Sequence, residues 1–304
     1  MHSIRLSALS RWLALTLFMT PASAADNFWT SSHAYLGEPR PGDTPKAFAP
    51  GKLAEPGTFV MGRSAFSEDG REFFFTQNDS WKSGEHAKVR MMRFADGRWS
   101  EPVTIATEAV SPTLSLDGRQ LFLRKKGMSN VWAMPRSGAG WGEPMPLLEM
   151  AQGLYDFMPT RSGRYYVGSD PDAADKARGS TYVISLLTLG GEKPRIQSLG
   201  APLNGPGFNG DLFIAPDESY MVLSAKVTAD FESQAFIAFR RADGTWTQPV
   251  SLGERINDGP AHRWGYFVPA SGDYLFYSWG TSERDCELRW VRFAALRERL
   301  RPKP

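Results

Sequence analysis

A turn followed by an apolar run recurs five times in this chain, and no other feature constrains the fold as strongly. The five copies are SEDGREFFF (67–75), SLDGRQLFL (115–123), TRSGRYYV (160–167), APDESYMVL (215–223) and PASGDYLFY (269–277). If Gly70, Gly118, Gly163, Glu218 and Gly272 are equivalent, the steps between copies are 48, 45, 55 and 54 residues. Asp-Gly and Ser-Gly pairs between alternating apolar runs predict hairpin turns, because these residues accept a positive φ at little cost.

A second motif recurs between these turns and marks the outer edge of a unit. Each copy contains a Gly turn, a Trp and a Pro, in FADGRWSEPV (94–103), RSGAGWGEPM (136–145) and FRRADGTWTQPV (239–250). Proline fits an edge strand, where its missing N–H breaks no ladder hydrogen bond. Each unit therefore holds four strands in about 45–50 residues, which is typical of a propeller blade. We expect an all-β fold, a β-propeller with five four-stranded blades. Six blades are the alternative if one blade is degenerate.

The two ends of the chain fit a closed ring. The last unit lacks a Trp-Pro strand, and the segment PKAFAP (45–50) near the N-terminus is placed to supply it. A ring closed in this way protects its strand edges. We divide the chain into a signal peptide (1–24), an N-terminal segment with the ring-closing strand (25–57), the propeller (58–294) and a basic C-terminal tail (295–304). We expect the tail to be solvated and frayed.

The first 24 residues have the three parts of a secretory signal. Arg5 and Arg11 give a positive n-region, residues 12–19 are apolar, and Ala22 and Ala24 are the small residues that precede a cleavage site. The apolar run is too short to cross a bilayer as a helix. We therefore expect cleavage after Ala24, no membrane insertion, and a periplasmic or secreted protein.

Charge and cysteine content exclude several classes of partner. Without the two arginines of the signal, the 35 Lys and Arg fall to 33 and equal the 33 Asp and Glu, so no basic excess favours nucleic acid. Cys286 is the only cysteine, which excludes an intramolecular disulfide and cysteine-based metal sites. His33 and His86 lack companion ligands, and the loop 170–180 lacks the later ligands of an EF-hand. We expect neither a metal nor a cofactor.

The Ser-x-Asp-Gly turns resemble the repeats of the TolB-type WD40-like β-propeller family. Segments similar to one exported subfamily are 35–51, 216–225, 238–257, 271–280 and 287–302. This chain departs from the pattern, because its first two turns lack Pro before Asp and its third and fifth turns lack the Asp. The resemblance implies a propeller fold and an exported location. It implies no reaction, because propellers host enzymes and interaction scaffolds alike.

The repeat register also predicts where a site lies. The first strand of each blade lines the central channel, so equivalent positions form rings around it. Seven residues before each turn residue, the ring is Arg63, Ser111, Asp156, Asp211 and Gly265. We expect this ring at one mouth of the channel, close to Glu108, Asn209, His262, Arg263 and Trp264. Two residues further on, the ring of Ala65, Thr113, Met158, Phe213 and Phe267 is predicted to be packing.

The polar ring is a candidate binding site for a small polar ligand. Arg63 offers a bidentate fork for a carboxylate or a phosphate, and Trp264 offers a face on which a sugar stacks. The alternative is that Arg63 neutralises the two aspartates and that the channel holds only water.

Three functions are compatible with these residues. The favoured one is an exported scaffold for a protein or cell-envelope component, with an exposed aromatic patch from Trp81, Phe208, Trp264 and Trp279. The second is a small-molecule carrier that uses Arg63. The third is a carbohydrate-active hydrolase with Asp156 and Asp211 roughly 5–9.5 Å apart. No Gly-x-Ser-x-Gly elbow, His-Glu-x-x-His motif or phosphate loop occurs, so we assign no catalytic residue.

Overall fold

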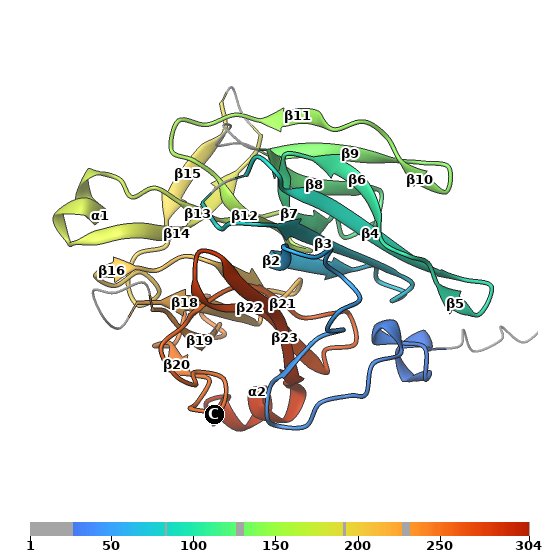
Figure 1. Ribbon diagram of the computed structural model, residues 1–304. Coiled ribbons are helices and arrows are strands. Elements are labelled where there is room, and N and C mark those ends of the chain that lie inside the picture. Colours follow the sequence, from blue (N-terminus) through green and yellow to red (C-terminus); the bar gives the residue numbers. More distant parts are fainter. Residues whose placement is uncertain (1–26, 83, 126–130, 191–192, 227–231, 304) are drawn as a thin grey trace, which may run out of the picture.

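The chain forms a propeller of five β-sheets (Figure 1). The computed structural model describes residues 27–303 apart from 83, 126–130, 191–192 and 227–231, so the predicted signal segment lies outside the described residues. The main path of each sheet has four strands, of which the first three follow one another in sequence. The prediction of an all-β propeller with five four-stranded blades is confirmed, and the alternative of six blades is wrong.

We number the blades in chain order. Blade 1 consists of β2 (Phe59–Phe66), β3 (Glu72–Asn78), β4 (Lys88–Ala95), β5 (Arg98–Trp99) and β6 (Val103–Thr107). Blade 2 consists of β7 (Ala109–Leu114), β8 (Gln120–Lys125), β9 (Val131–Ser137), β10 (Gly140–Trp141) and β11 (Met145–Leu148). Blade 3 consists of β12 (Tyr155–Pro159), β13 (Tyr165–Ser169), β14 (Ser180–Thr188), β15 (Arg195–Ser198) and β16 (Gly207–Phe208). Blade 4 consists of β17 (Leu212–Ile214), β18 (Tyr220–Ala225), β19 (Gln234–Phe239) and β20 (Val250–Ser251). Blade 5 consists of β21 (His262–Phe267), β22 (Tyr274–Ser282), β23 (Asp285–Arg292) and β1 (Lys46–Ala47).

The N-terminal strand β1 closes the ring, as predicted. Lys46 lies opposite Trp290 in an antiparallel pair with β23, and the amide of Phe48 donates a hydrogen bond to the carbonyl of Leu288 at 2.7 Å. The buried Phe48 ring then packs edge-on against Phe276, with 5.0 Å between ring centroids. The outer edge of blade 5 is thus paired with a strand from the other end of the chain.

The repeat turns join the first two strands of each blade, and all five predicted turn residues have a positive φ. The φ values are 76° at Gly70, 66° at Gly118, 80° at Gly163, 60° at Glu218 and 72° at Gly272. The serine and aspartate of the motif support the turn. In blade 1 the Asp69 carboxylate accepts hydrogen bonds from the Ser67 hydroxyl at 2.6 Å and from the Arg71 amide at 3.0 Å.

Glu218 takes the left-handed turn position that glycine takes in the other blades. A non-glycine residue is strained there, by roughly 1 kcal/mol. Its buried carboxylate accepts hydrogen bonds from Thr160 and Tyr166 at 2.8 Å each, and it forms ion pairs with Arg164 at 2.7 Å and with Arg240. Three of these partners belong to blade 3, so the carboxylate also ties blade 4 to its neighbour.

Each blade has a bulge in or just before its innermost strand. The residue with a left-handed φ at this bulge is Gly62, Ser111, Asp156, Asp211 or Gly265. In β7, β12 and β21 the bulge adds one residue relative to the paired strand, whereas in β2 it adds two. Gly62 is therefore the blade 1 member of the ring, and Arg63 is an additional residue. The register that we predicted from residue spacing is wrong by one position in this blade.

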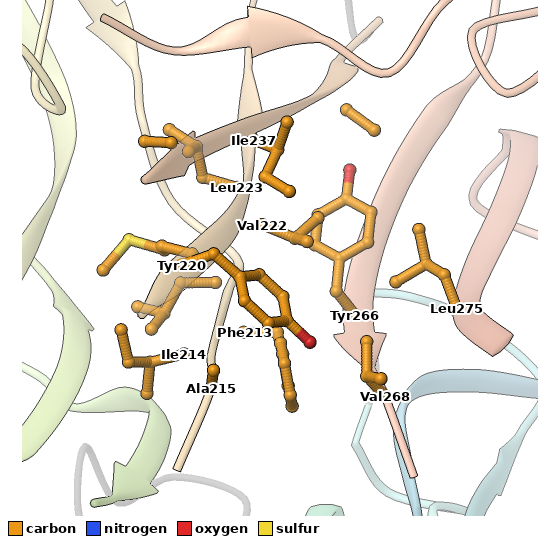
Figure 2. Close-up of a cluster of buried hydrophobic side chains, with 14 of the residues drawn as sticks. Phe213, Ile214, Ala215, Tyr220, Val222, Leu223, Ile237, Tyr266, Val268 and Leu275 are labelled. Atoms are coloured by element: carbon orange, nitrogen blue, oxygen red, sulfur yellow. The ribbon is translucent and has the colours of Figure 1, made fainter. Parts of the chain in front are cut away.

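The hydrophobic core lies between neighbouring blades. The largest cluster brings Phe213, Val222 and Ile237 of blade 4 together with Tyr266 and Leu275 of blade 5 (Figure 2). All five side chains are at most 3% exposed. Burying each of them contributes about 1.5–3 kcal/mol to the stability of the ring.

The described helices are short. The 3₁₀-helices Phe28–Thr30 and Tyr35–Gly37 precede β1, α1 (Ala173–Ala177) lies before β14, and α2 (Ala294–Leu300) follows β23. Leu296 and Leu300 of α2 pack against the core cluster, so the expectation of a frayed tail is wrong for this segment. Apolar packing outweighs fraying here. Among the described residues, no helix has the length and apolar character to span a membrane.

Candidate functional site

A cavity of about 740 Å³ occupies one end of the channel. Every blade contributes to it, through residues that include Gly62, Ser111, Asp156, Asp211 and Trp264. The cavity thus lies next to the ring of bulge residues. Its volume is in the range of sites that hold small ligands.

Six aromatic side chains form one continuous wall of this cavity, which we call the aromatic wall. Successive ring centroids lie 4.9, 4.9, 6.1, 4.8 and 4.7 Å apart along the series Tyr155, Tyr182, Phe208, His262, Trp264 and Trp81. Tyr155, Tyr182 and Phe208 belong to blade 3, His262 and Trp264 belong to blade 5, and Trp81 lies in the segment after β3. It offers aromatic rings to a ligand, and all of its members except Phe208 also carry a hydrogen-bonding group.

Tyr182 reaches the cavity from the third strand of its blade. Two glycines make this approach possible, because a Cβ atom at Gly168 or at Gly210 would overlap the Tyr182 ring. Tyr182 was not predicted, because the predicted ring was drawn from first strands only. Tyr155 was not predicted either, although it lies in the first strand of blade 3, one residue before Asp156. A glycine inside β13, next to otherwise bulky residues, is the signal that indicates a close approach of this kind.

Asp156 and Asp211 form a hydrogen-bonded pair on the floor of the cavity. Asp156 accepts a hydrogen bond from the amide of Leu212 at 3.1 Å. Burial, together with the charge of Asp156 and the hydrogen bond to it, raises the pKa of Asp211 well above its ordinary value. The pair therefore keeps a proton on Asp211 at pH values where an exposed aspartate has lost it.

His262 lies beside this pair as a neutral ring. Burial, and then the charges of Lys226 and Arg263, lower the pKa of His262 to about 3. Its Nδ1 atom lies 2.9 Å from the Ser233 hydroxyl, and its Nε2 atom lies 3.8 Å from the Asp211 carboxyl. Because the His262 imidazole is neutral and the Asp211 carboxyl is protonated, the two groups make a polar contact and not an ion pair.

Arg63 spans the channel beneath the carboxyl pair. Its guanidinium lies 3.1 Å from the Asp156 carboxylate and donates to the carbonyls of Leu212 and Tyr266 and to the Thr113 hydroxyl. The side chain is fully buried and faces a second cavity instead of the first. The expectation that Arg63 offers a fork to a ligand is therefore corrected, because protein groups already take its donors.

Two other predicted residues hold loops in place. Arg263 is 1% exposed and donates to the carbonyls of Ile256 at 2.7 Å and of Ala261 at 2.9 Å. Asn209 is buried and donates to the carbonyls of Gly205 and Gly207. Neither side chain lines the cavity. Of the predicted site residues, Ser111, Asp156, Asp211, His262 and Trp264 do line it.

A glycoside hydrolase separates its two carboxyl groups by roughly 5–9.5 Å, so that the sugar or a water fits between them. Asp156 forms an ion pair with Arg63, and its charge helps to raise the pKa of Asp211. The use of these two residues by a hydrolase stays a prediction.

The expected aromatic patch is also arranged differently. Trp81, Phe208 and Trp264 belong to the aromatic wall, and Trp264 is only 8% exposed. Trp279 is covered by the guanidinium of Arg289, 3.7 Å from its ring centroid. These four residues therefore do not form an exposed patch on one face.

Basic side chains gather on the cavity lining. Arg124, Lys125 and Lys226 line it together with Lys82, which is paired with Glu283 at 2.8 Å. Arg124 and Lys125 were not predicted as site residues, although they directly follow the apolar run of the second repeat, where β8 ends. Among the described residues, no group of three or more His, Cys, Asp or Glu side chains is placed to hold a metal ion.

Comparison with known proteins finds similarity only to solved structures. No family model matches the chain, and no curated protein does. Similar solved structures include the periplasmic gluconolactonase PpgL of Pseudomonas aeruginosa (16% identity, 72% of this chain and 65% of that one, TM-score 0.43). Others are TolB of Acinetobacter baumannii (13%, 76% and 54%, 0.45) and hydrazine synthase of Kuenenia stuttgartiensis (13%, 71% and 60%, 0.40). The chain spans less than two thirds of each of these proteins. The five sheets themselves show the β-propeller fold.

Proposed function

We propose that this protein is an exported propeller that binds a small anionic molecule with a hydroxyl-bearing ring, such as a sugar acid, in the cavity of the aromatic wall. The observation that carries the proposal is the combination of that wall with the basic side chains at its edge. Of the three functions that the sequence allowed, this is the small-molecule carrier. The aromatic wall and the basic side chains at its edge take the place of Arg63 as the contact residues.

The aromatic wall favours a ligand with an apolar face. The C–H face of a sugar ring stacks on aromatic side chains, while its hydroxyl groups need polar partners at the edges. Ser111, the protonated Asp211 and the neutral His262 all lie on the cavity lining. A protonated carboxyl both donates and accepts hydrogen bonds, which suits hydroxyl groups.

The charge balance favours an anionic ligand. Asp156 is neutralised by Arg63, and Asp211 holds a proton over an extended pH range. Arg124, Lys125 and Lys226 then outnumber the remaining acid, Glu108. A guanidinium or ammonium group facing a carboxylate or phosphate contributes charge-assisted hydrogen bonds.

The exported location is part of the same proposal. It is supported by the signal-like segment 1–24, with cleavage expected after Ala24. Fractionation of expressing cells, followed by N-terminal sequencing, tests it. A periplasmic or secreted protein that begins at Ala25 supports export, whereas a cytoplasmic protein that begins at Met1 contradicts it.

Isothermal titration tests the binding with glucuronate, glucose and acetate as probes. We expect glucuronate to bind and glucose, which lacks the carboxylate, to bind roughly tenfold more weakly. Acetate, which lacks the sugar ring, is expected to bind more weakly still. Arg124→Gln is expected to weaken glucuronate roughly tenfold and to leave glucose nearly unchanged.

Arg161→Gln, at the other end of the channel, is the matched control and is expected to change neither affinity. Equal affinities for glucuronate and acetate would contradict the proposal. So would the absence of glucuronate binding at about 10 mM, a concentration at which even a millimolar ligand stabilises the fold measurably.

A further inference from the structure

A second cavity, of about 630 Å³, lies at the other end of the channel, among the repeat turns. Arg63 lines this second cavity, whereas its partner Asp156 lines the first. Their ion pair therefore lies between the two cavities. The second cavity is a separate compartment with residues of its own.

The floor of the second cavity is apolar. Ala65, Met158, Phe213 and Phe267 line it, with Thr113 as the polar member of the same ring. The prediction that this ring is packing holds for Met158 and Phe213, which belong to the core cluster, and the members of the ring also border the open space of the channel. The walls add Pro159, Pro216 and Pro269, which have no N–H to offer a ligand.

Arginine side chains lie on the lining of the second cavity. Arg161 comes from the turn of blade 3, Arg297 comes from α2, and Arg301 directly follows α2. The acids on this lining are Glu68 and Asp217, and the Asp217 carboxylate accepts hydrogen bonds from the amide and the hydroxyl of Ser219 at 3.0 and 2.7 Å. Arg297 and Arg301 each also form an ion pair with Glu298 at 3.1 Å. The lining thus combines an apolar floor with three guanidinium groups, which face two lining acids and Glu298.

We propose that the second cavity binds an amphiphilic carboxylate, a medium-chain fatty acid or a molecule of the same chemistry. The alkyl chain lies against the floor formed by Ala65, Met158, Phe213 and Phe267. The carboxylate lies near Arg161 and Arg297, where a guanidinium fork matches its geometry. This inference does not rest on the function proposed for the first cavity, because the two share none of these residues.

Titration of the purified protein with decanoate, below its critical micelle concentration, tests the proposal. We expect decanoate to bind, and we expect affinity to rise roughly two- to fourfold per added CH₂ from hexanoate to decanoate. Decanol lacks the charge and is expected to bind at least about fivefold more weakly than decanoate. Equal binding of decanol and decanoate, or no dependence on chain length, would overturn the proposal.

Variants separate this site from the first cavity. Arg161 is exposed, so Arg161→Gln retains the fold and is expected to weaken decanoate at least about fivefold. Ala65→Phe fills the floor and is expected to abolish binding. Arg124→Gln, which is expected to weaken glucuronate in the first cavity, is expected to leave decanoate unchanged. Decanoate binding that is lost in Arg124→Gln but retained in Arg161→Gln would place the ligand in the first cavity and refute the inference.

Discussion

The guanidinium of Arg63 lies 3.1 Å from the carboxylate of Asp156, although the two residues belong to blades that are not neighbours in the ring. Both side chains are at most 6% exposed. The pair therefore acts as a brace across the channel. It also gives Asp156 its counter-charge, and Asp211 then carries the proton of the carboxyl pair.

Loss of this brace is expected to destabilise the ring. Arg63→Met keeps most of the side-chain volume but leaves Asp156 buried without a counter-ion, which costs about 3–5 kcal/mol. Urea unfolding at pH 7 measures the change. Lys52→Met, which removes the exposed ion pair with Glu38, is the matched control and is expected to cost no more than about 1 kcal/mol. A loss below about 1 kcal/mol for Arg63→Met would show that the brace is dispensable.

Asp211 is expected to make the protein less stable as the pH rises. Its pKa is raised in the folded state, so above pH 3.8 the folded protein binds more protons at this residue than the unfolded chain does. The free energy of unfolding then falls with pH, by at most about 1.4 kcal/mol per pH unit. Asp211→Asn removes this slope. When unfolding is measured from pH 4 to pH 8, the variant is expected to gain stability relative to the wild type as the pH rises. Parallel curves of unfolding free energy against pH would contradict the raised pKa of Asp211.

His262 is expected to act in the opposite direction. Its folded pKa of about 3 lies below the value of 6.5 for a free histidine, so the unfolded chain binds the extra proton between these values. Its contribution to stability is present above pH 6.5 and is lost as the pH falls towards 3. His262→Gln is therefore expected to lose less stability than the wild type between pH 6.5 and pH 4. A greater acid sensitivity of the variant would refute the neutral imidazole.

Glu218 is expected to stabilise the contact between blades 3 and 4 through its charge. Burial alone would raise the pKa of Glu218, but hydrogen bonds from Ser162, Thr160 and Tyr166, together with the charge of Arg164, lower it to about 2. Its contribution is present above pH 4.5 and is lost as the pH falls to 2. Glu218→Gln is expected to cost about 3–5 kcal/mol at pH 7 and much less near pH 2. An equal cost at both pH values would mean that shape, and not charge, holds the contact.

The fold was predictable because its signals are local and repeated. The turns at Gly70, Gly118, Gly163 and Gly272 have the dipeptides that suit a positive φ, and the missing outer strand of the last unit indicated the closure by residues 45–50. Glu218 shows that a residue other than glycine can take the left-handed conformation of this turn. Contacts made far away in sequence compensate for the strain, and a single sequence does not display them.

The site was predictable only in part, because its geometry depends on register and on distant neighbours. The second inserted residue in β2 moved Arg63 out of the ring, and no pattern of spacing reveals such an insertion. Arg263 resembles a ligand-binding residue in sequence, yet backbone carbonyls take its donors. Tyr182 enters the cavity from a third strand because Gly168 and Gly210 make room for it. In each case the three-dimensional neighbours, and not the residue itself, decide its role.

The pairing of β1 with β23 has a consequence for the assembly of this protein. The two strands lie near opposite ends of the chain, so this contact has a very high contact order and forms only after nearly all of the chain has been made. Until the two strands pair, β1 has no partner in its own molecule, and the outer edge of β23 is unpaired once that strand has formed. At high concentration, β1 of one molecule fits the same edge in another. Crowded refolding is therefore expected to yield domain-swapped dimers, in which two rings exchange their N-terminal strands.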